Sequence, residues 1–177
     1  MAILTQTTPN GTLVTKNATY LDTALTDSDT DGSLDLNDDD VFAINTYAII
    51  DAETVKITDA DDSSDRDITR EQSDHNSNAT SATAHESGAW VRLQGGATEL
   101  LTYEFDGSTY FAGFNIRSER GFWWSLEIDD EIVDTGFVDS SVPFYTEVRP
   151  RSTPAAGTWK ILVWASETRV FHGKIFN

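Results

Sequence analysis

Apolar and polar residues alternate along most of the second half of the chain. The alternation runs over residues 100–105, 122–129, 142–148 and 159–164. A period of two puts successive side chains on opposite faces of a β-strand, whereas a helix needs a period of 3.6 residues. We therefore predict a strand in each of these ranges.

Turn-forming residues separate the predicted strands. Glycine, proline and paired aspartates stand at 95–96, 106–107, 129–130, 150 and 154–157. Short strands at regular spacing, without a long helical pattern, are typical of an antiparallel β-sandwich. We expect one all-β domain over residues 1–177, built as a jelly-roll-like sandwich. Periodicity does not reveal strand order, so an immunoglobulin-like order stays open.

The first half of the chain is more polar than the second. Residues 1–88 hold 18 acidic and 4 basic residues, and all five tryptophans follow residue 88. Strands are still predicted over 13–15, 46–50 and 54–58, the last two as a hairpin around residues 51–53. We expect the core to come mainly from the second half.

Residues 59–88 form a long polar insertion, in which Ile68 is the one aliphatic residue larger than alanine. Such a segment cannot bury enough apolar surface to offset the entropy of ordering it. Two interpretations stay open. The insertion is either a mobile surface loop or a loop that orders by packing on a neighbouring subunit.

The charge balance excludes several classes of partner. The chain carries 30 acidic against 12 basic side chains, for a net charge of −18. No basic surface is available to neutralise phosphates or anionic lipid, so we expect no nucleic-acid partner and no membrane insertion. Aspartate occurs 20 times and lysine 4 times. This composition stays hydrated where salt screens charge, so we expect a halophilic source rather than an ordinary cell.

Residues 27–38 place oxygen-bearing side chains at alternate positions around Gly32. Alternate aspartates at loop positions one, three and five converge on one hard cation, and a glycine at position six permits the sharp turn. The pattern resembles the calcium loop shared by EF-hands, dockerins and thrombospondin-type repeats. Calcium is therefore the expected cofactor, with Leu34 anchoring the loop on the core. The candidate ligands are Asp27, Asp29, Asp31, Ser33, Asp35 and Asp38. We interpret residues 27–40 as an acidic calcium-type loop, with a solvated acidic loop as the alternative.

Large aromatic residues occupy both faces of the strand predicted over 122–129. One face fills the sandwich, so the other needs a second layer, a partner or a ligand. We therefore expect Trp123, Trp164 and His172 to form an interface or a ligand platform. His75 and His85 lie ten residues apart in the polar insertion. Their spacing is unspecific for a metal, so we expect surface histidines. No hydrolase or phosphate-binding motif occurs, so we expect no enzymatic activity.

Taken together, the size and strand pattern are similar to those of small β-rich structural proteins of viruses that infect halophilic archaea. These include jelly-roll capsid subunits and turret and decoration proteins. The resemblance implies a virion protein made in the host cytoplasm without a signal peptide, and the start of the chain has no such segment. Expected partners are further copies of the chain or other virion proteins. The alternative is a calcium-stabilised carbohydrate-binding or host-adhesion module, with a host-surface glycan as its ligand.

Overall fold

The computed structural model describes residues 11–28, 33–38, 40–59, 65–70, 72, 79–107, 113–118, 121–138, 145–149 and 155–176. Within these residues the regular structure consists of strands, and every strand pair is antiparallel. The predicted all-β fold is therefore confirmed. The described residues contain no helix with the length and apolar character needed to cross a membrane.

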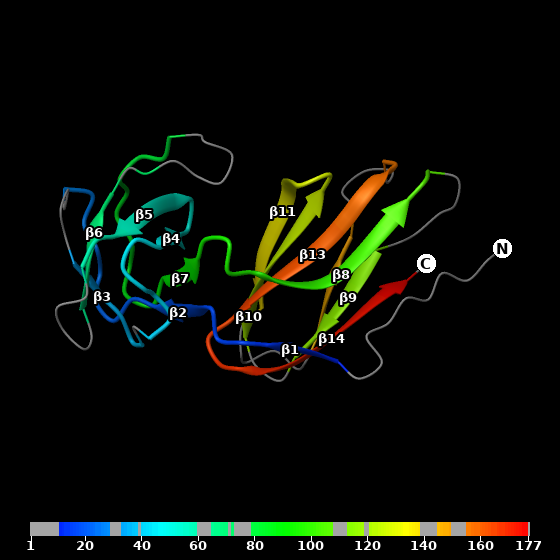
Figure 1. The fold of residues 1–177 in the computed structure, drawn as a ribbon, viewed down its shortest axis with the longest axis horizontal. Coiled ribbons are helices and arrows are strands. Elements are labelled where there is room, and N and C mark those ends of the chain that lie inside the picture. The colour runs from blue at the N-terminus through cyan, green and yellow to red at the C-terminus, as the bar shows by residue number, and fades with distance from the viewer. Residues whose placement is uncertain are drawn as a thin grey trace. The chain divides into compact units, whose positions relative to one another are not determined.

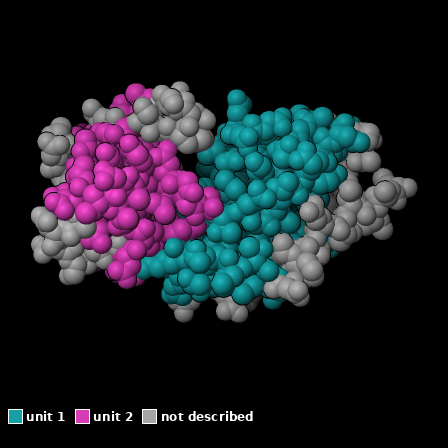
Figure 2. Space-filling view, in the orientation of Figure 1, with its two compact units in different colours: residues 1–16, 98–177 teal, residues 17–97 magenta. Residues whose placement is uncertain are grey.

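The chain divides into two compact units (Figure 2). Unit 1 comprises residues 1–16 and 98–177, and unit 2 comprises residues 17–97. Each unit has its own hydrophobic core. The sequence predicts one domain with a core from the second half, whereas the structure gives the first half a core as well. Its aliphatic residues are scattered singly along the chain and gather only when the strands of unit 2 pair.

Unit 1 is a β-sandwich of two four-stranded sheets (Figure 1). The first sheet has the order β1 (Thr12–Val14), β14 (Arg169–Phe176), β9 (Gly113–Arg117) and β12 (Tyr145–Val148). The second has the order β11 (Glu131–Val138), β10 (Phe122–Ile128), β13 (Gly157–Ala165) and β8 (Thr98–Phe105). From β8 to β14, every connection except the β10–β11 hairpin passes from one sheet to the other.

The sandwich core is rich in aromatic side chains from both sheets. Phe122 of β10 meets Phe171 of β14 with ring centroids 5.1 Å apart, and Phe114 of β9 lies 6.4 Å from Trp159 of β13. The apolar face predicted for β10 is confirmed, because Phe122, Trp124 and Leu126 are buried. Gly173 of β14 lets the sheets approach, since a Cβ there would stand 2.7 Å from the Leu101 side chain.

Unit 2 is one six-stranded sheet (Figure 1). Its order is β2 (Ala18–Tyr20), β7 (Trp90–Leu93), β4 (Tyr47–Ile50), β5 (Glu53–Ile57), β6 (Asp65–Thr69) and β3 (Ser33–Asp35). A bridge between Leu21 and Leu36 joins the chain after β2 to the chain after β3. Backbone hydrogen bonds of 2.9 and 3.0 Å flank this bridge, so the two ends of the sheet meet and the sheet closes on itself.

The core of unit 2 is made almost entirely of aliphatic side chains. Its buried members include Leu34, Leu36, Ile50, Ile57 and Val91. The predicted hairpin around residues 51–53 is confirmed, because β4 and β5 pair with Ile50 opposite Glu53. Asp51 in its turn has φ of 51°, a left-handed conformation that aspartate tolerates better than most residues.

Part of the range predicted as a polar insertion belongs to this sheet. Strand β6 pairs with both β5 and β3, and Ile68 and Arg66 are buried. The surface-loop interpretation is therefore wrong for residues 65–69. Further along, His85 exchanges backbone hydrogen bonds with Leu25. Residues 60–64, 71 and 73–78 of the predicted insertion lie outside the described part of the chain.

Candidate functional site

Three aromatic side chains lie on neighbouring strands of the β11–β10–β13–β8 sheet of unit 1, on its outer face. We call this surface the aromatic face (Trp123, Phe137 and Trp164). Trp123 of β10 is in register with Phe137 of β11 on one side and with Trp164 of β13 on the other. The rings of Trp123 and Phe137 have centroids 6.0 Å apart. Directly opposed residues of antiparallel strands project from the same face, so all three side chains belong to the outer face of this sheet.

The aromatic face is partly accessible. Phe137 is 43% exposed, Trp123 is half-buried and Trp164 is only 4% exposed. Ile132 and Val133, on the same strand as Phe137, are also exposed. Exposed side chains this large and apolar, gathered on one strand and its neighbour, are typical of surfaces that bind another protein.

Charged residues mark the other end of the same face. Lys160 of β13 is in register with Glu127 of β10. Its ammonium group forms an ion pair with Asp130. The hydrogen bond to Asp130 raises the pKa of Lys160, with Glu99 and Glu127 adding to the effect. The charged end of the face thus lies on β10 and β13, whereas on β11 the exposed Ile132 stands opposite Glu127 and extends the apolar surface along that strand.

A second apolar surface lies on the outer face of the other sheet of unit 1. We call it the β1–β14 patch (Leu13, Val170 and His172). Leu13 of β1 is directly opposite Val170 of β14, and the two side chains are 62% and 44% exposed. His172 is exposed and lies two residues beyond Val170, so it projects from the same face. The outer faces of a sandwich point in opposite directions, so the two apolar surfaces are on opposite sides of unit 1.

The structure describes the two ends of the predicted calcium loop. Asp27 is exposed, and Ser33 and Asp35 belong to β3. The predicted anchoring role of Leu34 is confirmed, because that side chain is fully buried in the core of unit 2. Asp38 accepts a hydrogen bond of 3.2 Å from the Asp40 backbone N–H.

The centre of that loop, including the predicted ligands Asp29 and Asp31, lies outside the described residues. Elsewhere, the residues that the structure does describe include no group of three or more histidine, aspartate or glutamate side chains arranged to hold a metal ion. The calcium site therefore stays a prediction.

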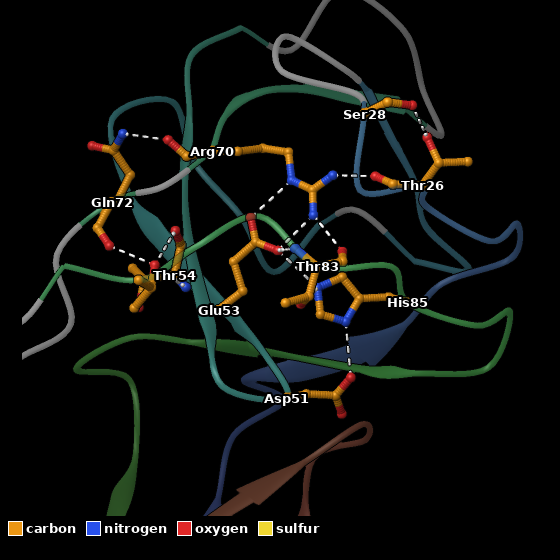
Figure 3. A network of polar contacts seen from close by, with 10 residues as sticks. Thr26, Ser28, Asp51, Glu53, Thr54, Arg70, Gln72, Thr83 and His85 are labelled. Atoms are coloured by element: carbon orange, nitrogen blue, oxygen red, sulfur yellow. Dashed lines mark hydrogen bonds and ion pairs between the residues drawn. The ribbon is translucent and has the colours of Figure 1, made fainter.

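Unit 2 contains a buried network of charged side chains (Figure 3). Glu53, at the start of β5, accepts hydrogen bonds of 2.8 and 2.6 Å from the guanidinium of Arg70, which directly follows β6. Its Oε2 also accepts from the Thr83 backbone N–H at 3.1 Å and lies 2.9 Å from His85 Nε2. Glu53, Arg70 and His85 are each at most 3% exposed. We call these three residues the buried triad.

Hydrogen bonds decide the charge state of Glu53. Burial alone raises the pKa of a carboxyl group, because it disfavours the charged form. In Glu53 the hydrogen bonds from Arg70, His85 and the Thr83 backbone outweigh burial, and the pKa falls below its ordinary value. The buried carboxylate is therefore ionised at neutral pH, as its pairing with Arg70 requires.

Buried arginines in unit 2 also hold its connecting segments. Arg70 donates to the backbone carbonyls of Thr26 and Thr83, and Arg66 donates to Phe42 at 3.3 Å. Each guanidinium group thereby gives a backbone carbonyl of a connecting segment a hydrogen-bond partner that strand pairing does not supply.

A third buried arginine acts on the β4–β5 turn. Arg92 of β7 donates a hydrogen bond of 3.1 Å to the Asp51 carbonyl. Burial lowers the pKa of Arg92 to about 10, against the opposing effect of the Asp51 charge. The side chain therefore keeps its positive charge at neutral pH and continues to hold the turn.

The sequence reasoning missed the buried triad. His85 is predicted as a surface histidine, and the structure shows it buried, so that prediction is wrong. The one available signal is the scarcity of basic residues in the first half. Among the four that occur in residues 1–88, Arg66 and Arg70 are buried. Their partners lie on other strands and cannot be read from local spacing.

Comparison of the chain with models of protein families, with curated proteins and with solved structures gives no match.

Proposed function

We propose that the protein is a structural subunit of a virus particle, in its capsid, turret or decoration layer, and that calcium stabilises it. In this proposal the sandwich of unit 1 is the assembling body. Copies of the chain, or other virion proteins, dock on its outer faces, while the acidic loops stay hydrated. The observation that carries the proposal is the pair of apolar surfaces on opposite sides of unit 1.

The strand order of unit 1 supports the jelly-roll part of the proposal. Counted from one to eight along the chain, the sandwich strands lie in the orders 1-8-3-6 and 2-7-4-5. A jelly roll is a double-sheet sandwich of eight strands, which viral capsid proteins use, so two sheets of four strands each support this part of the proposal. Lectins use the jelly roll as well, so the assembly function needs evidence beyond the fold.

That evidence comes from the aromatic face and the β1–β14 patch. An isologous dimer buries one patch against the same patch of its partner. Unit 1 instead has two different apolar patches on opposite sides. One patch of a copy can therefore contact the other patch of the next copy, or a second protein. Such heterologous contacts build rings and extended arrays. A particle shell needs contacts of this kind.

The acidic composition predicts how assembly depends on salt. At a net charge of −18, copies repel one another in dilute buffer. In about 1 M salt the Debye length falls to roughly 3 Å, so this repulsion is screened while apolar contacts persist. Assembly should therefore strengthen as the salt concentration rises.

Sedimentation velocity of the full chain in high salt with calcium tests the assembly proposal. We expect oligomers that Phe137→Ser and Val170→Ser each reduce in size, because each change removes one apolar surface. Ile44→Ser is the matched control, because Ile44 is 48% exposed but belongs to unit 2, and it should leave the oligomers unchanged. A chain that stays monomeric at every salt and protein concentration would refute the proposal.

The alternative glycan-binding function makes a different prediction. Sugars stack on exposed ring faces, and the 4% exposure of Trp164 leaves Trp123 and Phe137 as the accessible rings. A glycan array that shows binding to the monomer, lost in Trp123→Ala, would favour the adhesion module over the virion subunit.

The calcium part of the proposal is tested separately. A cation that binds only the folded chain stabilises it in proportion to RT ln(1 + [L]/Kd). Chelation should therefore lower the unfolding temperature, and Asp29→Ala should abolish the difference between chelated and calcium-loaded protein. Equal unfolding temperatures for the original chain in both conditions would identify residues 27–38 as a solvated acidic loop.

A further inference from the structure

The imidazole of His85 lies between two carboxylates (Figure 3). Its Nδ1 is 2.8 Å from Asp51 Oδ2, and its Nε2 is 2.9 Å from Glu53 Oε2. The side chains of His85 and Glu53 are 1% and 0% exposed, whereas that of Asp51 is 59% exposed. One carboxylate is therefore locked in the interior, and the other can turn into water.

The number of N–H groups on the ring decides which contacts it can make. A charged imidazolium has an N–H on both nitrogens and donates to both carboxylates. A neutral imidazole has a single N–H, so its other nitrogen would direct a lone pair at a carboxylate oxygen. Glu53 cannot move away, because Arg70 and the Thr83 backbone hold it. In the neutral state the N–H therefore stays on Nε2, facing Glu53, and the contact with Asp51 is lost.

We infer that the contact between His85 and Asp51 is a pH-dependent latch, closed when the imidazole is charged and open when it is neutral. The latch ties the segment before β7 to the turn between β4 and β5. Because His85 and Leu25 exchange backbone hydrogen bonds of 2.8 and 2.9 Å, the latch also holds the chain that follows β2. The inference does not depend on the proposed assembly function.

The charged groups around His85 come from three elements. Asp51 and Glu53, on the β4–β5 hairpin, favour the charged ring. Arg70, at the end of β6, opposes it, because the guanidinium and the ring share Glu53 Oε2. Arg92 of β7 acts indirectly, through its hydrogen bond to the Asp51 carbonyl. Histidine is the side chain whose charge changes most readily near neutral pH, so the latch is tested by comparing mildly acidic with mildly alkaline solution.

Asp51→Asn is the variant that isolates the latch. An amide can accept from an N–H or donate to a bare nitrogen, so asparagine satisfies Nδ1 in either state of the ring. We expect the unfolding midpoint of the original chain to fall by about 2–4 °C more than that of Asp51→Asn between about pH 5.5 and pH 8. Asp22→Asn is the matched control, because Asp22 is an exposed aspartate of unit 2 outside the latch, and it should keep the full pH dependence.

Nitrogen-15 NMR of the His85 ring in the original chain provides a second test that needs no variant. We expect both nitrogens to be protonated in the closed state, at the acidic end of the series, and only Nε2 to be protonated once the ring is neutral. Equal pH dependence of the midpoint in the original chain and Asp51→Asn would overturn the inference. A neutral ring protonated on Nδ1 near pH 8 would also overturn it, because the contact with Asp51 would then persist.

Discussion

Unit 1 and unit 2 both bury one face of short antiparallel strands, but different interactions hold them together. The core of unit 1 is built on aromatic rings such as Phe122, Phe171 and Trp159. The core of unit 2 is aliphatic apart from Phe42, and the buried triad lies in the same unit. In unit 2, where buried aromatic residues are scarce, hydrogen-bonded charges hold the connecting loops. The stability of unit 2 should therefore respond to pH and to single charge changes, and that of unit 1 should respond to changes in side-chain volume.

The largest effect is expected from truncating an aromatic residue of unit 1. Phe122 is fully buried in edge-to-face contact with Phe171. Phe122→Ala should lower the free energy of unfolding by about 3–5 kcal/mol, because it removes buried apolar contacts and leaves a cavity. Denaturant unfolding measures the loss. A loss below about 1 kcal/mol would mean that the aromatic core does not hold unit 1 together.

Breaking the buried triad should have the next largest effect. Arg70→Met leaves Glu53 charged and buried without its cation, which should reduce the free energy of unfolding by about 3 kcal/mol. The double variant Arg70→Met with Glu53→Gln removes both charges and should recover part of the loss. If both variants unfold as the original chain does, the triad contributes nothing to the stability of unit 2.

The pH dependence in acid should come from unit 2 as well. The pKa of Glu53 is lowered from 4.5, so the folded state favours the ionised carboxylate. This stabilisation is present above the unfolded pKa and is lost as the pH falls through the folded one. We expect thermal unfolding midpoints below pH 4.5 to fall less steeply in Glu53→Gln than in the original chain. The exposed Glu147→Gln, in unit 1, is the matched control and should leave the slope unchanged.

The smallest effect is expected from a surface ion pair of unit 1. Arg149 and Glu147 lie 2.8 Å apart, with side chains 63% and 40% exposed. Solvent and salt screen such a pair, so Arg149→Ala should change the free energy of unfolding by less than about 0.5 kcal/mol. Comparison of Arg149→Ala with Arg70→Met shows how much of the loss in stability depends on the burial of the ion pair. A loss as large as that of Arg70→Met would remove the contrast between the units.

Local pattern was enough to predict much of unit 1. The alternation over 122–128 correctly assigned a strand and its buried face, because those side chains repeat every second residue in the sequence itself. The hairpin around residues 51–53 was predicted as well, because two strand-forming runs flank a short turn there, and Ile50 pairs with Glu53 as expected. Strand β6, inside the polar range 59–88, was not predicted. It has few apolar residues, and its position depends on pairing with β5 and β3.

The residues of the candidate sites also differ in how far the sequence predicted them. The outward direction of Trp123 follows from alternation, but the burial of Trp164 depends on what surrounds β13 in the folded chain. The prediction for His85 failed because an isolated histidine among serines and threonines has no local signature of a partner. Its two carboxylate partners stand 34 and 32 residues away in the sequence.

The sequence by itself therefore determined the all-β character, the positions of the strands with strong alternation, and the acidic surface. These properties depend on each residue and its near neighbours, through the period of two and the sum of charges. Tertiary structure alone decided that there are two cores and that Glu53, Arg70 and His85 meet. Strand pairing brings together residues far apart in the chain, and once water is excluded around them a buried charge persists only beside its partner.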